Sequence, residues 1–471
     1  MTTFRNTFSM RSLLIAGAAW VLAIAPSSVS AETLAGALAR AYQHNPELNA
    51  ERASLRATDE DVPQALSGYR PTITFDASTG ITVSRNRPNG RPNTTTTLYP
   101  SSLSLSVVQP LFRGFRTQNA VAQAEAGVRA SRSSLINTEQ NIFVSAAQAY
   151  MDVIADRQIL VLRQQSLEFL NEQVRAAEAR FQVGEGTRTD VAQANARRAF
   201  ALAQVSVARA NLTTSNAVYR QVIGTDPRNL RSPAPYSGIP SNLEGALAGA
   251  LNTHPAILAG RANVDVAQSA VAIAEGELLP TLDLQGSGSR SWDQGAAGGP
   301  NDSFSATLQL SVPIYQGGRV TSRVRQSIET LGQRRLELVV TREQVRAAVL
   351  SSFAALQSAR AQVEASESEV SAAQTALAGV LEERRVGQRT TLDVLDSQDD
   401  VISAQLTQVE ARRDVVVASY SLASSLGQLT AESLGLQVAR YDPTEHYDAV
   451  RDAWYGLRTP DGRGGPIFGS D

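Results

Sequence analysis

The sequence predicts a mainly α-helical fold with a β-barrel part, built from two copies of one structural unit. Three observations support this prediction. Motifs recur at a nearly constant offset, apolar residues recur every seven positions over two very long stretches, and each stretch follows two segments of alternating polarity. We therefore expect an internally duplicated chain with long coiled-coil helical hairpins and two β-hairpins.

The composition excludes several classes of protein. With 471 residues the chain is long enough for a large core or for several domains, and its net charge of −2 argues against a mainly electrostatic nucleic-acid binder. The absence of Cys excludes disulfides, thiolate metal sites and a Cys nucleophile. The three histidines are scattered, at His44, His254 and His446. We expect no enzymatic activity, no cofactor, no metal site and no nucleic-acid partner.

The first 31 residues have the pattern of a signal peptide. Arg5 and Arg11 precede an apolar run over 13–25, Pro26 ends that run, and small residues at 29–31 fit a cleavage site. An apolar run of about 13 residues is too short to cross a hydrocarbon core of roughly 30 Å. We expect removal of residues 1–31 from a protein of the cell envelope.

The remaining chain is an internal duplication. The segment 34–39 recurs at 243–248, and similar pairs of motifs continue to the end of the second copy. Two copies are too few for a solenoid, so each copy is one large unit. We divide the chain into a first repeat (32–235), a second repeat (236–427) and a C-terminal equatorial segment with a disordered tail (428–471).

Each repeat contains a β-hairpin with one apolar face, expected at about 71–110 and about 280–313. In the first, Ile73 and Phe75 alternate with Thr72 and Thr74. The chain thus offers four strands of roughly ten residues, the length of a membrane-crossing strand. Four prolines mark the expected junctions between the strands and the helices: Pro71, Pro110, Pro280 and Pro313.

Helices fill the rest of each repeat. The pattern over 33–66 predicts one helix, and a heptad repeat over 121–181, matched over 324–377, predicts a coiled coil with a stutter. About 65 helical residues make a rod of roughly 100 Å. A second, antiparallel helix follows each rod, at about 190–222 and 392–425. The turns at the helix tips are assigned to three glycines: Gly184, Gly186 and Gly387.

These parts restrict the assembly of the protein. Four strands cannot close a barrel, since the smallest membrane barrels use about eight strands, and a sheet in lipid cannot keep an open edge. The barrel must therefore be shared between chains. We expect a trimer that forms a twelve-stranded β-barrel on a twelve-helix α-barrel.

Several strings carry a family resemblance. They are LPTLDL at 279–284, VPIYQGG at 312–318, RFQVG at 180–184 with TDV at 189–191, and VGQRTTLDVLD at 386–396. In this order, and duplicated, they resemble the TolC-like outer-membrane channel-tunnel proteins, also called outer-membrane efflux proteins. The C-terminal string around Trp454 is similar to the tails of alphaproteobacterial members.

The resemblance implies a function as well as a fold. It implies a homotrimer whose barrel lies in outer-membrane lipid and whose helical tunnel crosses the periplasm. Such a trimer serves as the exit duct of a tripartite export system, opened by a periplasmic adaptor (membrane fusion) protein and an inner-membrane ABC, RND or MFS pump. The exported material, a protein of type I secretion or a small toxic compound, stays open.

A second hypothesis comes from a different class of protein. The chain could be a non-channel periplasmic coiled-coil protein, structural or adaptor. Such a protein would not need four strands with one apolar face.

Asp393 and Asp396 are the candidate selectivity residues. They lie three positions apart, so they share one face of a helix just after its start. In a trimer they would form two rings of carboxylates that attract cations. Alternatively, Asp393 meets only the helix dipole, and Thr390 or Thr391 is the N-cap. The resemblance favours the ring, because the family's selectivity aspartates match these two positions.

The resemblance also places a periplasmic gate at the same end of the molecule. Thr189, Asp190 and Arg389 match positions whose polar links hold the tip closed in the family. A tyrosine that shares in those links in the best-known member is Arg384 here. We therefore expect the gate at this place, with a different pattern of bonds.

Overall fold

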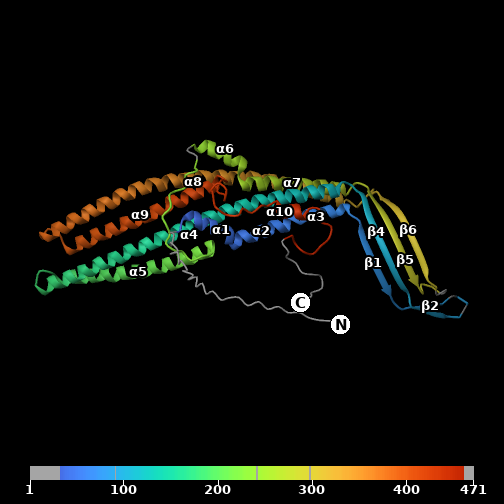
Figure 1. The fold of residues 1–471 in the computed structure, drawn as a ribbon, viewed down its shortest axis with the longest axis horizontal. Helices are drawn as coiled ribbons and strands as arrows, with labels where there is room; N and C mark the ends of the chain where they lie inside the picture. The colour runs from blue at the N-terminus through green and yellow to red at the C-terminus, as the bar shows by residue number, and fades with distance from the viewer. Residues whose placement is uncertain (1–31, 88, 91, 240–241, 296–298, 461–471) are drawn as a thin grey trace, which may run out of the picture.

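The computed structural model describes residues 32–460, apart from 88, 91, 240–241 and 296–298. The predicted signal peptide (1–31) and the end of the predicted tail (461–471) lie outside the described residues. The molecule is elongated, with long helices over most of its length and the strands at one end (Figure 1). The mainly α-helical class with a β part is confirmed.

The helical prediction over 33–66 is confirmed, but the helix is not continuous. Three helices stand there, α1 (Leu34–His44), α2 (Pro46–Asp59) and α3 (Asp61–Leu66), followed by the 3₁₀ turn η1 (Ser67–Tyr69). The first break has a local cause, since the Asn45 side chain accepts a hydrogen bond from the Glu47 amide at 2.9 Å and caps α2, which begins with a proline.

The second repeat has a similar break between two helices, again with a side-chain N-cap followed by a proline. His254 separates α6 (Leu243–Thr253) from α7 (Pro255–Gly276), and its Nδ1 accepts a hydrogen bond from the Ala256 amide at 3.2 Å. Burial lowers the pKa of His254, which favours the neutral ring that such an acceptor requires. His254 is therefore an N-cap.

The strands form one main sheet and a small extension. The main sheet has the order β1 (Thr72–Thr79), β4 (Ser101–Arg113), β5 (Thr281–Trp292) and β6 (Asn301–Ser311), with every pair antiparallel. Within the expected range of the first hairpin (about 71–110), β2 (Thr82–Asn86) and β3 (Thr94–Leu98) form a separate ladder beyond β1 and β4. The pairing of β4 with β5 joins the two hairpins.

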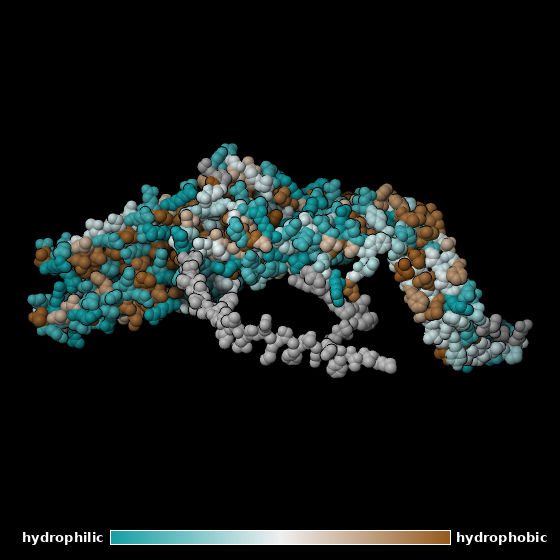
Figure 2. All heavy atoms as spheres, in the orientation of Figure 1, coloured by the Kyte–Doolittle hydropathy of each residue, from teal (hydrophilic) through white to brown (hydrophobic). Residues whose placement is uncertain are grey.

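The register places apolar residues on one face of the sheet. Phe75 lies opposite Leu105, which lies opposite Gly288, which lies opposite Phe304. Phe304 is 87% exposed, so the chain does not cover this face. Hydrophobic atoms gather over the part of the sheet nearer the helices (Figure 2). Hydroxyl pairs bridge the strands on the opposite face, among them Ser287 with Ser305 at 2.8 Å. The predicted apolar and polar faces are confirmed.

The four junction prolines have different surroundings. Pro71 and Pro280 directly precede β1 and β5, and Pro313 follows β6. Pro110 lies inside β4, which continues to Arg113 through a register shift just after the proline, so it does not end the strand. A proline, which has no N–H, is tolerated in a strand at such an irregularity.

The backbone turns sharply where the sheet meets the helices. Gly114 has a φ of +59°, and a Cβ on it would lie 2.5 Å from the carbonyl oxygen of Gly276. A Cβ on Gly276 would in turn lie 2.5 Å from the carbonyl oxygen of Gly114. Only glycine at both positions allows β4 to pass the end of α7 this closely.

Two helical hairpins form the long part of the molecule. α4 (Arg116–Gln182) and α8 (Arg319–Arg385) each have 67 residues, and each is followed by a shorter helix, α5 (Arg188–Ile223) or α9 (Thr391–Ser425). The predicted long helices and their partners are confirmed. Among the described residues, no helix is both long and apolar enough to cross a membrane.

The main hydrophobic core lies midway along the rods. It joins α1, α2, α4, α5 and α9 around large buried side chains: Leu38, Leu55, Phe143, Tyr150 and Tyr219. A smaller core joins α8 with α7 and α9 around Ile257, Val349, Leu356 and Leu422.

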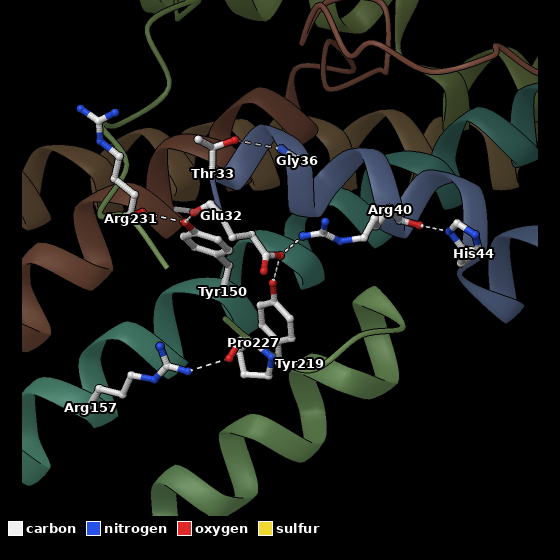
Figure 3. A network of polar contacts seen from close by, with 10 residues as sticks. All are labelled: Glu32, Thr33, Gly36, Arg40, His44, Tyr150, Arg157, Tyr219, Pro227 and Arg231. Carbon is white, nitrogen blue, oxygen red and sulfur yellow. Dashed lines mark hydrogen bonds and ion pairs between the residues drawn. The ribbon is translucent and has the colours of Figure 1, made fainter. Parts of the chain in front are cut away.

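The beginning of the described chain is fixed to this core. The Tyr150 hydroxyl lies 2.7 Å from the carbonyl oxygens of both Glu32 and Arg231, and the Glu32 carboxylate accepts hydrogen bonds from Arg40 and Tyr219 (Figure 3). Burial raises the pKa of Tyr219 to about 12, so this phenol stays protonated and donates.

The C-terminal segment also packs on the first half of the chain. It contains α10 (Glu445–Val450), where the buried His446 lies 3.1 Å from the buried carboxylate of Asp59. Further along, the Arg70 guanidinium donates to the Ala453 carbonyl at 2.6 Å and lies over the ring of Trp454. Residues 445–454 are therefore ordered against α2 and the start of β1. The division of the chain into repeats stays a prediction.

Candidate gate at the helical tips

Both helical hairpins turn in the same way. Gly184 and Gly387 each have a φ of +81°, a left-handed conformation that favours glycine. The Glu185 amide donates to the Arg180 carbonyl, and the Gln388 amide donates to the Glu383 carbonyl, both at 2.9 Å. These bonds close α4 and α8.

Gly186 lies after this turn and serves a different need. A Cβ on it would lie 3.3 Å from both the Arg180 Cβ and the Phe181 amide nitrogen. Gly186 therefore keeps the loop close to the last turn of α4, and it does not end the helix.

The return helices begin with capping boxes. In α9, the Thr390 Oγ1 accepts a hydrogen bond from the Asp393 amide at 3.2 Å, and Asp393 Oδ2 accepts from the Thr390 amide at 2.8 Å. Thr187 and Asp190 repeat the arrangement at the start of α5. These bonds satisfy amides that a helix start leaves without partners.

The capping carboxylates are held in their charged form. Hydrogen bonds from the Thr390 amide and hydroxyl lower the pKa of Asp393, and hydrogen bonds from the Thr187 hydroxyl and amide lower the pKa of Asp190. Asp393 has two candidate roles: a pore ring, and a helix start at which Thr390 is the N-cap. The structure shows Thr390 as the N-cap. This cap does not exclude a pore role, because one carboxylate oxygen remains outside the capping bonds.

Asp396 lies one turn further along α9 and has a basic partner. The guanidinium of Arg197, on α5, donates to Asp396 Oδ1 at 2.7 Å and to Asp399 Oδ2 at 3.2 Å. Sequence reasoning missed Arg197 and Asp399. The three-residue spacing of Asp396 and Asp399 allows one arginine to bond both carboxylates. No local sequence pattern indicates which arginine this is, since Arg197 lies almost 200 positions away in the chain.

The other expected gate residues bond elsewhere within the chain. Arg384 is half-buried and donates to the Gln173 Oε1 at 2.7 Å, while its Nε and Nη2 have no hydrogen-bond partner. Burial lowers the pKa of Arg384. Arg389 donates to Glu383 at 2.7 Å, and Thr189 is exposed. No direct bond joins Thr189, Asp190, Arg384 and Arg389 to one another within the described chain.

Across the described residues, no group of three or more His, Asp or Glu side chains is placed to hold a metal ion. The tips thus contain two capped turns and the half-buried Arg384, whose Nε and Nη2 have no hydrogen-bond partner. They also contain the carboxylates of Asp396 and Asp399, which are paired with the Arg197 guanidinium.

Comparison with known proteins identifies the family of the chain. The family described as "Outer membrane efflux protein" matches the chain twice, over residues 37–225 and 246–428. The "Outer membrane efflux protein BepC" of Brucella suis biovar 1 (strain 1330) is 47% identical over 433 residues, which cover 92% of this chain and 93% of BepC. The "Outer membrane protein TolC" of Escherichia coli (strain K12) is 28% identical over 429 residues, 87% of this chain and 85% of TolC.

Solved structures agree on the fold. The Campylobacter jejuni CmeC outer membrane channel has a TM-score of 0.75 at 14% identity, with 90% of each chain covered. The outer-membrane channel OprN has a TM-score of 0.72 at 19% identity, covering 84% of this chain and 90% of that one. The double match follows the internal duplication. The chain belongs to the outer membrane efflux protein family, and its place of action is the outer membrane.

Proposed function

We propose that three copies of this chain form an export duct, with a shared β-barrel in the outer membrane and a helical tunnel below it. The observation that carries the proposal is the four-stranded sheet with an uncovered apolar face. Within the described residues, the outer edges of β1 and β6 pair with no other strand. Such edges cannot remain open in hydrocarbon.

Joining copies edge to edge pairs the open edges of β1 and β6 and lets the apolar face of the closed barrel meet lipid. Each chain contributes an even number of alternating antiparallel strands, so β6 of one copy meets β1 of the next in an antiparallel pair. Three copies give twelve strands, above the minimum of about eight for a closed membrane barrel. The number three follows from the family resemblance. The apolar face then meets lipid, and the hydroxyl-rich face lines the pore.

The helices offer a matching surface for a second copy. On α8 the apolar side chains of Leu336, Val339 and Val340 are each more than half exposed. Leu336 and Val340 border an open groove of about 870 Å³ that also includes Gly332 and Glu337. An exposed apolar stripe on a rod of 67 residues requires a partner helix, and the neighbouring copy in the trimer supplies it.

The tips would close this tunnel at its periplasmic end. Asp393 and Asp396 would face the axis as rings that favour cations, and Thr189, Asp190, Arg384 and Arg389 would hold neighbouring tips together. The free donors of Arg384 suit such a bond between copies. An adaptor protein and an inner-membrane ABC, RND or MFS pump would release these bonds, and the duct itself would perform no chemistry.

The relatives suggest two kinds of cargo. BepC, the 47% identical relative, is named for efflux, which favours small compounds as the first candidate. The "Alkaline protease secretion protein AprF" of Pseudomonas aeruginosa is 28% identical over 356 residues, so type I protein secretion is the second candidate. Deleting the gene separates them: greater drug sensitivity with an unchanged set of secreted proteins supports efflux, and the reverse result supports secretion.

Cysteine cross-linking tests the shared barrel, since the chain has no native Cys. One cysteine is placed on the polar face of β1 at Ser78, and a second is placed in turn at Ser303 and Ser305 on β6. We expect oxidation in membranes to yield covalent dimers and trimers. The control pair Ser106→Cys with Ser287→Cys links register partners within one chain, so its oxidation should leave the protein running as a monomer in a denaturing gel. The shared barrel would be contradicted if every β1–β6 pair gave only monomers while the control pair formed its disulfide.

A further inference from the structure

Arg197 joins the two helical hairpins of one chain close to their tips. It belongs to α5, in the hairpin α4/α5, and both of its carboxylate partners belong to α9, in the hairpin α8/α9. Its two nitrogens reach Asp396 at 2.7 Å and Asp399 at 3.2 Å. Among the described residues, these are the only hydrogen bonds between α5 and α9.

The surroundings hold the guanidinium in place. Leu170 of α4, Ala201 of α5 and Leu395 of α9 form a small buried cluster, and all three line one small pocket together with Arg197. The Arg197 side chain is 39% exposed, so its stem packs along the helices while its head meets the carboxylates. The planar fork matches two carboxylates placed three residues apart on one helix face, a geometry that a lysine ammonium would not reproduce.

We propose that Arg197 is a positioning residue of the gate: its fork keeps the hairpin α8/α9 closed against the hairpin α4/α5 and must release Asp396 for the tip to open. The inference rests on the proposed function and deepens it. Arg197 is separate from the links that the family resemblance supplies, because those involve Thr189, Asp190, Arg384 and Arg389.

The fork also sets the charge at this level of the tip. Asp396 and Asp399 bring two carboxylates per chain to this level, and Arg197 is the guanidinium paired with both. Arg163 lines the same small pocket as Arg197 and Asp399. Loss of Arg197 would therefore remove one positive charge per chain, three per trimer, from beside these carboxylates. The same substitution should loosen the gate and strengthen block of the pore by polyvalent cations, two effects that a general loss of packing would not combine.

The expected size follows from the exposure of the pair. A partly exposed ion pair changes an equilibrium by about threefold, and three chains that open together multiply this to roughly 30-fold. The test uses the full-length protein purified from membranes, with Arg197→Gln, Arg197→Lys and the control Arg198→Gln. Arg198 is exposed and forms no ion pair in the described part of the chain.

In planar bilayers we expect Arg197→Gln to raise open probability by up to about 30-fold and to strengthen block by a trivalent cation. Arg197→Lys should fall between it and the wild type, and Arg198→Gln should match the wild type. The reversed pair Arg197→Asp with Asp396→Arg should restore closure. A conducting wild type whose Arg197→Gln variant equals Arg198→Gln would overturn the role of Arg197.

A second readout does not depend on conduction. Deuterium uptake over residues 392–400 should rise in Arg197→Gln and stay at the wild-type level in Arg198→Gln. Equal uptake in the two variants would overturn the inference even for a conducting channel. A wild type that never conducts, with raised uptake in Arg197→Gln alone, would instead contradict the proposed duct and support the contact between the hairpins.

Discussion

Replacing Thr390 by Val removes the N-cap of α9 while keeping the shape of the side chain. The hydroxyl makes two bonds with Asp393: it accepts from the amide at 3.2 Å and donates to Oδ2 at 2.8 Å. The bond from the Thr390 amide to the same carboxylate, at 2.8 Å, does not need the hydroxyl. The perturbation is therefore confined to one cap.

The expected cost is about 1 kcal/mol per chain, the usual value for loss of a side-chain cap. It falls on the first turn of α9, which lies far from the main core, so it appears as local opening and not as global unfolding. An energy of about 1 kcal/mol corresponds to roughly fivefold more frequent opening. Only the bond from the hydroxyl to the Asp393 carboxylate depends on charge. Because the pKa of Asp393 is lowered, that bond is fully formed above the ordinary value of 3.8 and is lost as pH falls below it towards the lowered pKa.

Hydrogen–deuterium exchange of the peptide around residues 390–396 measures this directly. Thr391→Val is the matched control, because Thr391 is the first residue of the same helix and makes no side-chain hydrogen bond in the described chain. We expect roughly fivefold faster exchange in Thr390→Val alone. Equal exchange rates in the two variants would refute the capping argument.

Three further predictions concern pore, core and pH. Asp393→Asn with Asp396→Asn should weaken block of single-channel current by polyvalent cations, because the carboxylate rings are lost. Leu356→Ala should destabilise the rods by about 2–5 kcal/mol, seen as a lower melting temperature, because Leu356 is only 1% exposed. Since the pKa of Tyr219 is raised to about 12, its stabilisation is complete below pH 10 and is lost towards pH 12; in urea titrations, Tyr219→Phe should flatten this loss.

The long elements were predictable because their signals are repetitive. Heptad rows fixed the course of α4 and α8, and a glycine with positive φ ends each of them where the sequence indicates. Alternation fixed the two faces of the sheet. Errors arose where a single side chain decides the course of the backbone, as when Asn45 caps α2 and divides an otherwise continuous helical pattern.

The candidate site was predictable only in part, for a physical reason. A capping box is a local pattern, so Asp393 and its possible N-cap Thr390 could be identified from a stretch of four residues. The fork of Arg197 is a tertiary contact, and charge patterning along one helix cannot indicate a residue on another helix. The contact of His446 with Asp59, which fixes the C-terminal segment, lies beyond local patterns for the same reason.

The central claim is that hairpins from several chains combine into one pore in lipid. Single-channel recording of the purified protein in a planar bilayer tests it most directly. We predict discrete, stable conductance steps from material that needs detergent to leave the outer membrane. A monomer that is soluble in plain buffer and gives no conductance when offered a bilayer would contradict it.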